Sequence, residues 1–301
     1  MRIQKLNDMY ELLKNKKDKK RLVVAYANDS HTIEAVHIAI QKGLIEAILV
    51  GDYNVIKEIC DKKAYDISSF KIVHEISDVK CAKIAVKMIK DKEADFIMKG
   101  LISTDKYMHA ILNKESGLVP PRSTLSHVTV VEPPLYHKLL IFGDAAVIPI
   151  PDLNQKKAII KYLSATAKSL GIECPKVAII APSEQVLPKI QSTVDGAILA
   201  KMGDRGVFGN VKVEGPLAID IAIDKESADI KGIKSDVAGD ADCLLFPNIE
   251  SANVFYKTNT KFGNARLGAF IVGATVPCVL SSRGDSVDTK LNSIAIAALI
   301  S

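Results

Sequence analysis

The sequence predicts an α/β protein of two domains, each built on a parallel sheet, with an active-site cleft between them. Short apolar runs alternate with helical patterns along the first half of the chain, and such alternation implies parallel strands with helices on both faces. The 301 residues are enough for two domains of ordinary size. A double proline, Pro133-Pro134, interrupts the pattern near the middle of the chain.

The composition is that of an ordinary globular protein, with 48% hydrophobic and 25% charged residues and a formal net charge of +5. This mild positive excess suits anionic small molecules. The lysines are scattered, and the densest run, Lys14 to Arg21, is interpreted as a solvated connector after an amphipathic helix. We therefore expect small-molecule substrates and no nucleic acid.

Five cysteines lie far apart, each within or beside an apolar segment, without a CxxC pair or a signal peptide ahead of them. This pattern is typical of reduced, mostly buried thiols, so we expect a cytoplasmic protein. Apolar runs stay shorter than the roughly 20 residues that span a bilayer, and no membrane association is expected.

The first domain is expected to alternate strands and helices, starting with the amphipathic helix that carries Leu6, Tyr10 and Leu13. Ser77 is expected to cap one of the later helices. The predicted strands are Leu22–Ala27, Ala47–Val50, Ile72–His74 and Asp95–Met98, and the predicted helices are Thr32–Lys42, Asn54–Lys63 and Val79–Lys90.

Lys99 and Gly100 follow a buried type of strand and precede a helix capped by Ser103 or Thr104. Ligands of open parallel sheets bind at the carboxyl ends of the strands. The Lys99-Gly100 turn is therefore a candidate anion site, and simple capping of the helix is the alternative.

The strand predicted at Ser123–Val131 follows Arg122 and contains His127. Taken alone, Arg122 is more readily explained by pairing with a surface carboxylate than by pairing with a phosphate. His127 is interpreted as a structural histidine rather than a base.

The second domain begins at the double proline, with further strands and helices. The predicted strands are Leu139–Phe142, Ala146–Ile150, Lys176–Ala181, Val211–Glu214 and Asp242–Phe246, and the predicted helices are Asn154–Leu170, Val194–Met202 and Leu217–Ile223. Two more strands, Gly268–Gly273 and Pro277–Leu280, are predicted before the final helix. Polar loops at residues 203–206, 214–217 and 247–253 are the expected cleft-lining positions.

The last helix, Thr289–Leu299, is apolar on almost every side and is expected to be buried, against the first domain or a second subunit. The first domain would then be discontinuous. We expect it to comprise residues 1–131 and 275–301, with residues 132–274 forming the second domain.

The stretch before that helix joins a short β-type run to hydroxyls, an arginine and a glycine, with Ser286 as the expected N-cap. Ser282, Arg283 and free amide groups would meet at a strand end and helix start, where this kind of fold binds anions. A phosphate-bearing ligand is the first hypothesis, and a capped surface turn is the alternative.

Several nucleotide, metal and hydrolase motifs are absent from the sequence. There is no GxGxxG after a strand, no GxxxxGK[ST], no HExxH and no GxSxG, and no pair of cysteines or histidines stands at metal-binding spacing. Rossmann dehydrogenases, P-loop nucleotidases, zinc hydrolases and α/β-hydrolases lose support.

Six co-linear motifs, spread over nearly the whole chain, resemble the phosphate acyltransferases, the family of phosphate acetyltransferase and butyryltransferase, and most closely its butyryl-transferring members. The motifs are Met98–Leu101, Ser126–Val128, Lys201–Gly206, Glu214–Ala222, Pro247–Lys257 and Leu280–Ser286. The resemblance implies reversible transfer of an acyl group between coenzyme A and phosphate. It also implies an isocitrate/isopropylmalate dehydrogenase-like fold and a homo-oligomer. Coenzyme A and phosphate would be substrates, with no bound cofactor and no metal.

The resemblance also assigns candidate site residues. Ser282 and Arg283 fall on a serine-arginine pair of the family, and Tyr256-Lys257 on a pair that contacts acyl phosphate in acetyl-specific relatives. Ser126 falls on the phosphate pocket. Lys99, Gly100, Thr104 and Asn253 are further phosphate candidates, and Gly284 and Ser286 are coenzyme A candidates. Arginine and lysine donors suit a charged leaving group and a developing oxyanion.

The position of the base departs from the family. In acetyl-specific relatives an aspartate seven residues after the serine is proposed to take the thiol proton, and this position is Thr289 here. Asp288 and Asp285 are the available carboxylates, with Asp288 favoured and Asp285 able to serve as an N-cap instead.

Three alternatives stay open at this point. The chain would be a phosphate acetyltransferase, a dehydrogenase of the same fold that uses NAD and a metal, or a non-catalytic sensor of coenzyme A or acyl phosphate. The dehydrogenase would need clustered Asp or His metal ligands, which the sequence does not display.

Overall fold

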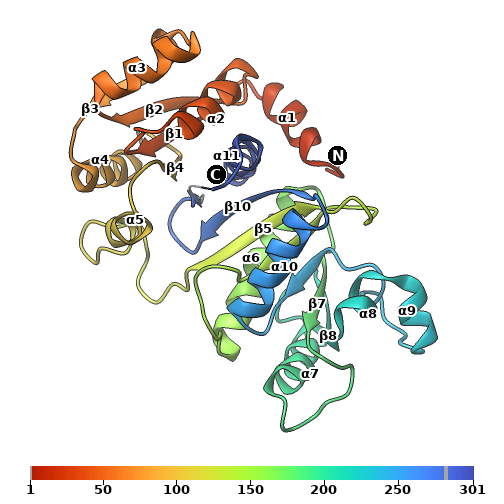
Figure 1. The fold of residues 1–301 in the computed structure, drawn as a ribbon. Helices are drawn as coiled ribbons and strands as arrows, with labels where there is room; N and C mark the ends of the chain where they lie inside the picture. Colours follow the sequence, from red (N-terminus) through yellow and green to blue (C-terminus); the bar gives the residue numbers. More distant parts are fainter. Residues whose placement is uncertain (1, 281–283) are drawn as a thin grey trace. The chain divides into compact units, whose positions relative to one another are not determined.

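The computed structural model describes residues 2–280 and 284–301, and the chain divides into two compact units. Unit 1 comprises residues 1–5 and 126–266, and unit 2 comprises residues 6–125 and 267–301 (Figure 1). The boundaries expected at 131/132 and 274/275 and the cleft between the domains stay predictions.

Unit 2 contains a mostly parallel sheet with the strand order β3-β2-β1-β4-β11-β10. Val24 of β1 pairs with Leu49 of β2 on one side and with Met98 of β4 on the other. Only β10, which pairs with β11, runs antiparallel among these described strands. Their bounds are β1 Lys20–Ala25, β2 Ile45–Gly51, β3 Lys71–His74, β4 Phe96–Lys99, β10 Arg266–Val272 and β11 Cys278–Val279.

The helices of unit 2 bury apolar faces on this sheet, and the expected caps at Ser77 and Ser286 are confirmed. The C-terminal helix α11 packs against α1 and α2 (Figure 1), so its apolar side chains are covered within the unit. Their bounds are α1 Leu6–Lys14, α2 Ser30–Gln41, α3 Tyr53–Lys63, α4 Asp78–Lys90, α5 Thr104–Ile111 and α11 Val287–Ile300, with a 3-10 turn at Ile67–Ser69.

Unit 1 contains a second sheet segment, in the order β5-β6-β9-β7-β8. The strands β6, β9, β7 and β8 are parallel, and β5 runs antiparallel to β6. Their bounds are β5 Ser126–Glu132, β6 Leu140–Gly143, β7 Lys176–Ile180, β8 Lys212–Leu217 and β9 Cys243–Leu245.

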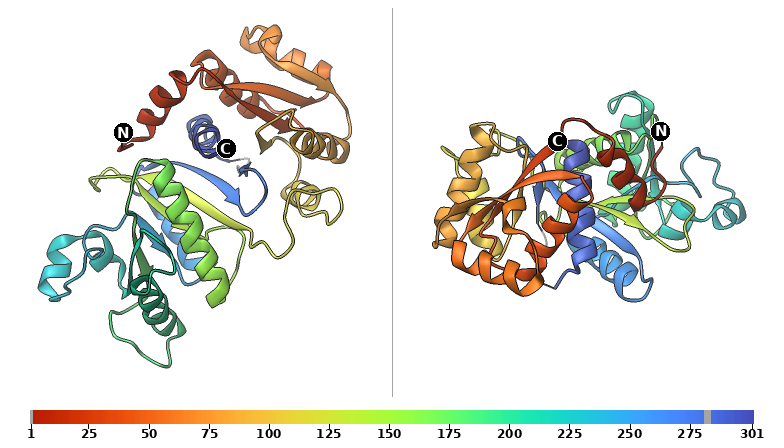
Figure 2. Two further views of the ribbon diagram at one scale, coloured as in Figure 1. Left: turned by 180° about the vertical axis from the view of Figure 1, so that it is seen from behind. Right: turned by 90° about the horizontal axis from the view of Figure 1, so that it is seen from above.

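Helices cover both faces of this segment, with α6 and α10 on opposite sides (Figure 2). Neighbouring residues of β6 show the alternation, because Phe142 contacts aromatic rings of α10 while Gly143 lies near Ile159 and Leu163 of α6. The bounds are α6 Leu153–Ser169, α7 Gln191–Asp204, α8 Ile219–Ile223, α9 Lys225–Ile230 and α10 Ile249–Lys261.

Three expectations for the second half of the chain are wrong. Ala146–Ile150 is a turn rather than a strand, because the Asp144 carboxylate binds the amides of residues 146–148. Residues 249–253 belong to α10, which the Asn248 side chain caps at the Ser251 amide. Residues 203–204 end α7, and residues 214–217 lie within β8, where Gly215-Pro216 is tolerated at the sheet edge.

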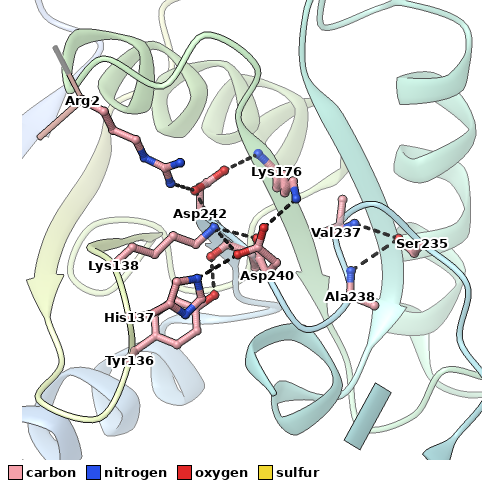
Figure 3. A network of polar contacts seen from close by, with 11 residues as sticks. Arg2, Tyr136, His137, Lys138, Lys176, Ser235, Val237, Ala238, Asp240 and Asp242 are labelled. Carbon is pink, nitrogen blue, oxygen red and sulfur yellow. Dashed lines mark hydrogen bonds and ion pairs between the residues drawn. The ribbon is translucent and has the colours of Figure 1, made fainter. Parts of the chain in front are cut away.

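Asp240 and Asp242 belong to one network of charges at the amino-terminal side of the unit 1 sheet (Figure 3). Asp242 is buried and accepts from Arg2 Nη2 at 3.1 Å and Lys138 Nζ at 2.8 Å. Asp240 accepts from Lys138 and Lys176 at 2.7 and 2.6 Å and lies 2.9 Å from His137 Nε2. The network ties residue 2, the segment before β6 and the start of β7 to the segment before β9.

The charges of Asp240 and its neighbours predict a pH-dependent contribution to stability. Burial opposes its negative charge, but hydrogen bonds from Lys138 and Lys176 outweigh burial and lower the pKa of Asp240 well below the ordinary value. A lowered folded-state pKa gives stability that is present above the unfolded value of about 3.9 and is lost as the pH falls below it.

We expect Asp240→Asn to lower the free energy of unfolding by about 1 kcal/mol at pH 7, since the site is partly exposed. The difference from wild type should shrink as the pH is lowered to 3. Urea unfolding at steps between these values measures it. Asp236→Asn, which removes an exposed partner of Lys212, is the matched control. A difference that stays constant with pH would contradict the linkage.

Candidate functional site

The carboxyl ends of β1 and β4 in unit 2 form one closely packed pair of turns. The Gly100 amide donates to Ala25 O at 3.0 Å, and the Leu101 amide donates to Tyr26 O at 2.8 Å. A Cβ atom on residue 100 would lie 2.2 Å from Tyr26 O, so only glycine fits. This close packing explains why the turn needs glycine, and the contact of Gly100 with phosphate stays a prediction.

Lys99 ends β4 as a buried side chain, and its ammonium folds back over the following turn. It donates to Gly100 O at 3.2 Å and to Ile102 O at 2.8 Å. Ser103, rather than Thr104, caps α5, and Thr104 is the exposed first residue of that helix. Lys99 therefore braces a turn at the ligand-binding edge of a parallel sheet.

β11, which is parallel to β4, ends at this same edge of unit 2. Ser282 and Arg283 lie outside the described residues. Gly284 is exposed and Asp285 is half-buried. Ser286 caps α11 by accepting from the Thr289 amide at 3.1 Å, so Asp285 is not the cap.

Asp288, in the first turn of α11, accepts a hydrogen bond from Asn292 Nδ2 at 3.0 Å. Asn292 also accepts from the Tyr10 hydroxyl and donates to Leu267 O. The favoured base is thus oriented by a neighbour one helical turn away.

Lys290 is a charged residue near this edge that sequence reasoning missed. Its side chain is buried, and burial lowers the pKa of its ammonium, while the negative charges of Asp29 and Asp285 oppose that change. The signal for Lys290 in the sequence was its position within a mostly apolar helix. It adds a positive charge near the half-buried Asp285.

In unit 1, the helix α10 brings three candidate residues together. Tyr256 lies beside Lys257, whose Nζ is 4.8 Å from the centre of the tyrosine ring. Tyr256 also packs edge-on against Phe142 of β6, with ring centres 6.5 Å apart. Asn253, one turn earlier, donates from Nδ2 to Ala145 O at 3.2 Å. Tyr256, Lys257 and Asn253 are thus carried by one helix at the carboxyl end of β9.

Ser126 is fully buried at the start of β5, and its hydroxyl donates to Asp144 Oδ2 at 3.0 Å. Its contact with phosphate stays a prediction. The neighbouring His127 is also buried, with Nδ1 3.4 Å from Thr129 Oγ1, which fits a structural histidine. Asp144 was missed, because a single aspartate after a strand looks like any turn residue.

An open pocket of about 480 Å³ lies at the other end of the unit 1 strands, beside the first residue of β8, Lys212. Asp204, Glu214 and Asp236 line it together with Lys212. The Lys212–Asp236 ion pair across it is exposed on both sides. None of the residues predicted for phosphate or coenzyme A lines this pocket.

Within residues 2–280 and 284–301, no group of three or more His, Cys, Asp or Glu side chains is placed to hold a metal ion. In the same ranges, no helix has the length and apolar character needed to cross a membrane. The five thiols are free, and only Cys174 is not buried.

The family model described as "Phosphate acetyl/butaryl transferase" matches residues 7–82 and 68–298 of this sequence. The chain belongs to this family. The chain is 43% identical over 298 residues to the phosphate butyryltransferase of Clostridium acetobutylicum, covering 99% of this chain and 98% of that protein. It is 38% identical to the phosphate acetyltransferase of Thermotoga maritima, covering 93% and 95% of the two chains.

Solved structures of other proteins share the fold. The branched-chain phosphotransacylase of Enterococcus faecalis aligns with a TM-score of 0.82 and 28% identity, covering 93% of this chain and 98% of that one. A 4-hydroxythreonine-4-phosphate dehydrogenase from Klebsiella pneumoniae aligns with a TM-score of 0.57 and 11% identity over 94% and 99% of the two chains. The predicted α/β fold class of dehydrogenase-like type is confirmed, and so is the predicted family.

Proposed function

We propose that this protein is a phosphate acyltransferase that reversibly converts an acyl-CoA and phosphate into an acyl phosphate and coenzyme A, with butyryl-CoA as the preferred substrate. The observation that carries the proposal is the nearly full-length identity of 43% and 44% to two proteins named phosphate butyryltransferase. The matched region, which covers 99% of this chain, spans the positions of all six motifs.

The chemistry requires cations and amide donors. In the direction of acyl-CoA synthesis, the thiolate of coenzyme A attacks the carbonyl carbon of the acyl phosphate, a carbon–sulfur bond forms and phosphate leaves with the electrons of the carbon–oxygen bond. Donors that stabilise the oxyanion and the leaving phosphate lower this barrier. We assign these tasks to Arg283, Ser282 and Lys257, with Tyr256 beside Lys257.

The other candidates take supporting roles in the proposal. Asn253, Ser126, Lys99, Gly100 and Thr104 are assigned to phosphate or acyl phosphate. Gly284 and Ser286 are assigned to coenzyme A. We also propose that the enzyme has no bound cofactor, is a homo-oligomer and works in the cytoplasm, where its thiols stay reduced.

The proton of the coenzyme A thiol needs an acceptor. A carboxylate of ordinary pKa near 3.9 is a weak base for a thiol near 8.5, a gap of about 6 kcal/mol. Cations that lower the pKa of the thiol close the gap, and Arg283 and Lys257 are the candidates. The base, Asp288 or Asp285, is then helpful rather than indispensable.

A phosphate acetyltransferase is the second candidate function, favoured by 38% identity to the enzyme of that name from Thermotoga maritima. The two functions differ in the acyl group and share the reaction. One extra methylene in an apolar pocket changes binding by only about 1–3 kcal/mol.

The substrate assignment predicts phosphate-dependent thiol release from acyl-CoA, with a four-carbon acyl group preferred over acetyl. Acetyl-, propionyl-, butyryl- and isobutyryl-CoA are compared by thiol release with and without phosphate. A tenfold preference for acetyl-CoA would overturn the assignment of butyryl-CoA as the preferred substrate and leave the proposed type of reaction unchanged. Absence of phosphate-dependent release from all four would overturn the reaction itself.

Arg283→Ala is expected to lower turnover by about 100-fold or more, as for other single donors to a transition-state oxyanion. Steady-state turnover of butyryl-CoA measures it, with circular dichroism to verify folding. Lys62→Ala, which removes an exposed cation of α3 outside the six motifs, is the control and should behave as wild type. Wild-type turnover in a folded Arg283→Ala protein would contradict a catalytic role of Arg283 and favour the alternative interpretation of this stretch as a capped surface turn.

For the base, Asp288→Asn is expected to lose about 10²-fold in turnover, within the range for general-base removal, and Asp285→Asn less. Part of the loss should be recovered at higher pH, where more thiol is ionised. A pH series of turnover for both variants measures this. An inactive Asp285→Asn beside a nearly normal Asp288→Asn would make Asp285 the base.

A further inference from the structure

Asp144 is a buried carboxylate that directly follows β6 and is 2% exposed. Its Oδ1 accepts from the amides of Ala146 and Val147, both at 2.8 Å. Its Oδ2 accepts from the Ser126 hydroxyl at 3.0 Å, the His127 amide at 3.1 Å and the Ile148 amide at 3.2 Å. Five donors thus converge on one carboxylate.

This arrangement requires a carboxylate. A buried charge is tolerated where donors satisfy it, and here both oxygens face only donors. An asparagine would present an NH₂ group to at least two of the N–H groups, in place of an acceptor. The turn at residues 145–149 therefore depends on the charge and on both oxygens.

That turn holds the helix that carries the phosphate candidates. Three hydrogen bonds connect residues 143–149 to β9 and α10. The Phe246 amide donates to Gly143 O at 3.1 Å and the Ile249 amide to Pro149 O at 2.9 Å, and Asn253 Nδ2 donates to Ala145 O at 3.2 Å. Tyr256 of α10 rests on Phe142, two residues before Asp144.

We propose that Asp144 is a positioning residue for the phosphate or acyl-phosphate site on α10. Its carboxylate fixes the turn at residues 145–149, the turn fixes the first two turns of α10, and these set the positions of Asn253, Tyr256 and Lys257. Ser126 acts in the same way, as a donor that orients Asp144. The inference rests on the proposed function, because it concerns the phosphate site of that reaction.

The first test compares the kinetics of Asp144→Asn and Asp152→Asn. Asp152 follows the same turn and caps α6, and asparagine is also a good cap, so this control should match wild type. Asp144→Asn should raise the KM for phosphate about tenfold or more, because small misplacements of binding groups are costly. A folded Asp144→Asn protein with a normal KM for phosphate overturns the proposal. This holds even if its turnover is reduced, because a smaller fraction of active enzyme lowers turnover and leaves the KM unchanged.

The second test is hydrogen exchange without ligand, which needs no turnover. Asp144→Asn should speed exchange about tenfold at residues 146–148 and in the first two turns of α10, whereas Asp152→Asn should affect only the start of α6. Unchanged exchange in α10 overturns the proposal. If wild type shows no phosphate-dependent thiol release, the proposed function fails, and the exchange result alone decides whether Asp144 positions α10.

Ser126→Ala serves if Asp144→Asn does not fold, because it removes one of the five donors. Acting through Asp144, it should speed exchange at residues 146–148 and in α10 in the same direction and to a smaller extent. A serine that only binds phosphate would leave exchange of the ligand-free protein unchanged, and this result in a folded Ser126→Ala protein would overturn its role.

Discussion

Buried peptide groups at the ends of parallel strands need hydrogen-bond partners, and this constraint shapes both candidate regions. In unit 2 the turn after β4 is closed by Gly100 and Leu101 on the carbonyls of β1, and by the Lys99 ammonium on its own turn. In unit 1 the turn after β6 is closed by the Asp144 carboxylate. Side chains of opposite charge thus satisfy the peptide groups of the two turns. The Lys99 ammonium donates to carbonyl groups, and the Asp144 carboxylate accepts from amide groups.

The same hydrogen bonds orient both turns in the protein without a ligand. Groups that are already oriented lose little entropy on binding and stabilise charge more effectively than mobile ones. Lys99 and Asp144 are both buried and bonded to backbone within a few residues. Lys257, another candidate ligand contact, is by contrast exposed on α10.

The sequence predicted the strands and helices whose apolar periodicity is strong, including α6 and α11, and the caps at Ser77 and Ser286. It failed where a distant group decides the local structure. Residues 146–150 have a strand-like pattern, but the amides bind Asp144 instead of a neighbouring strand. The α10 helix has few buried residues and a polar start, so its pattern resembled a loop. Lys290 and Asp144 belong to none of the motifs, and the burial that distinguishes them is visible only in the structure.

The sheet of unit 2 has its inner strand β11 and the helix α11 supplied by the last residues of the chain. During synthesis, the segment up to residue 125 therefore emerges with β4 as an unpaired edge, and an open apolar edge is prone to wrong pairing. The intervening residues 126–266 form nearly all of unit 1 and are complete earlier. The strand that closes the unit 2 sheet is therefore made only after residues 126–266, so this sheet is completed later than that of unit 1.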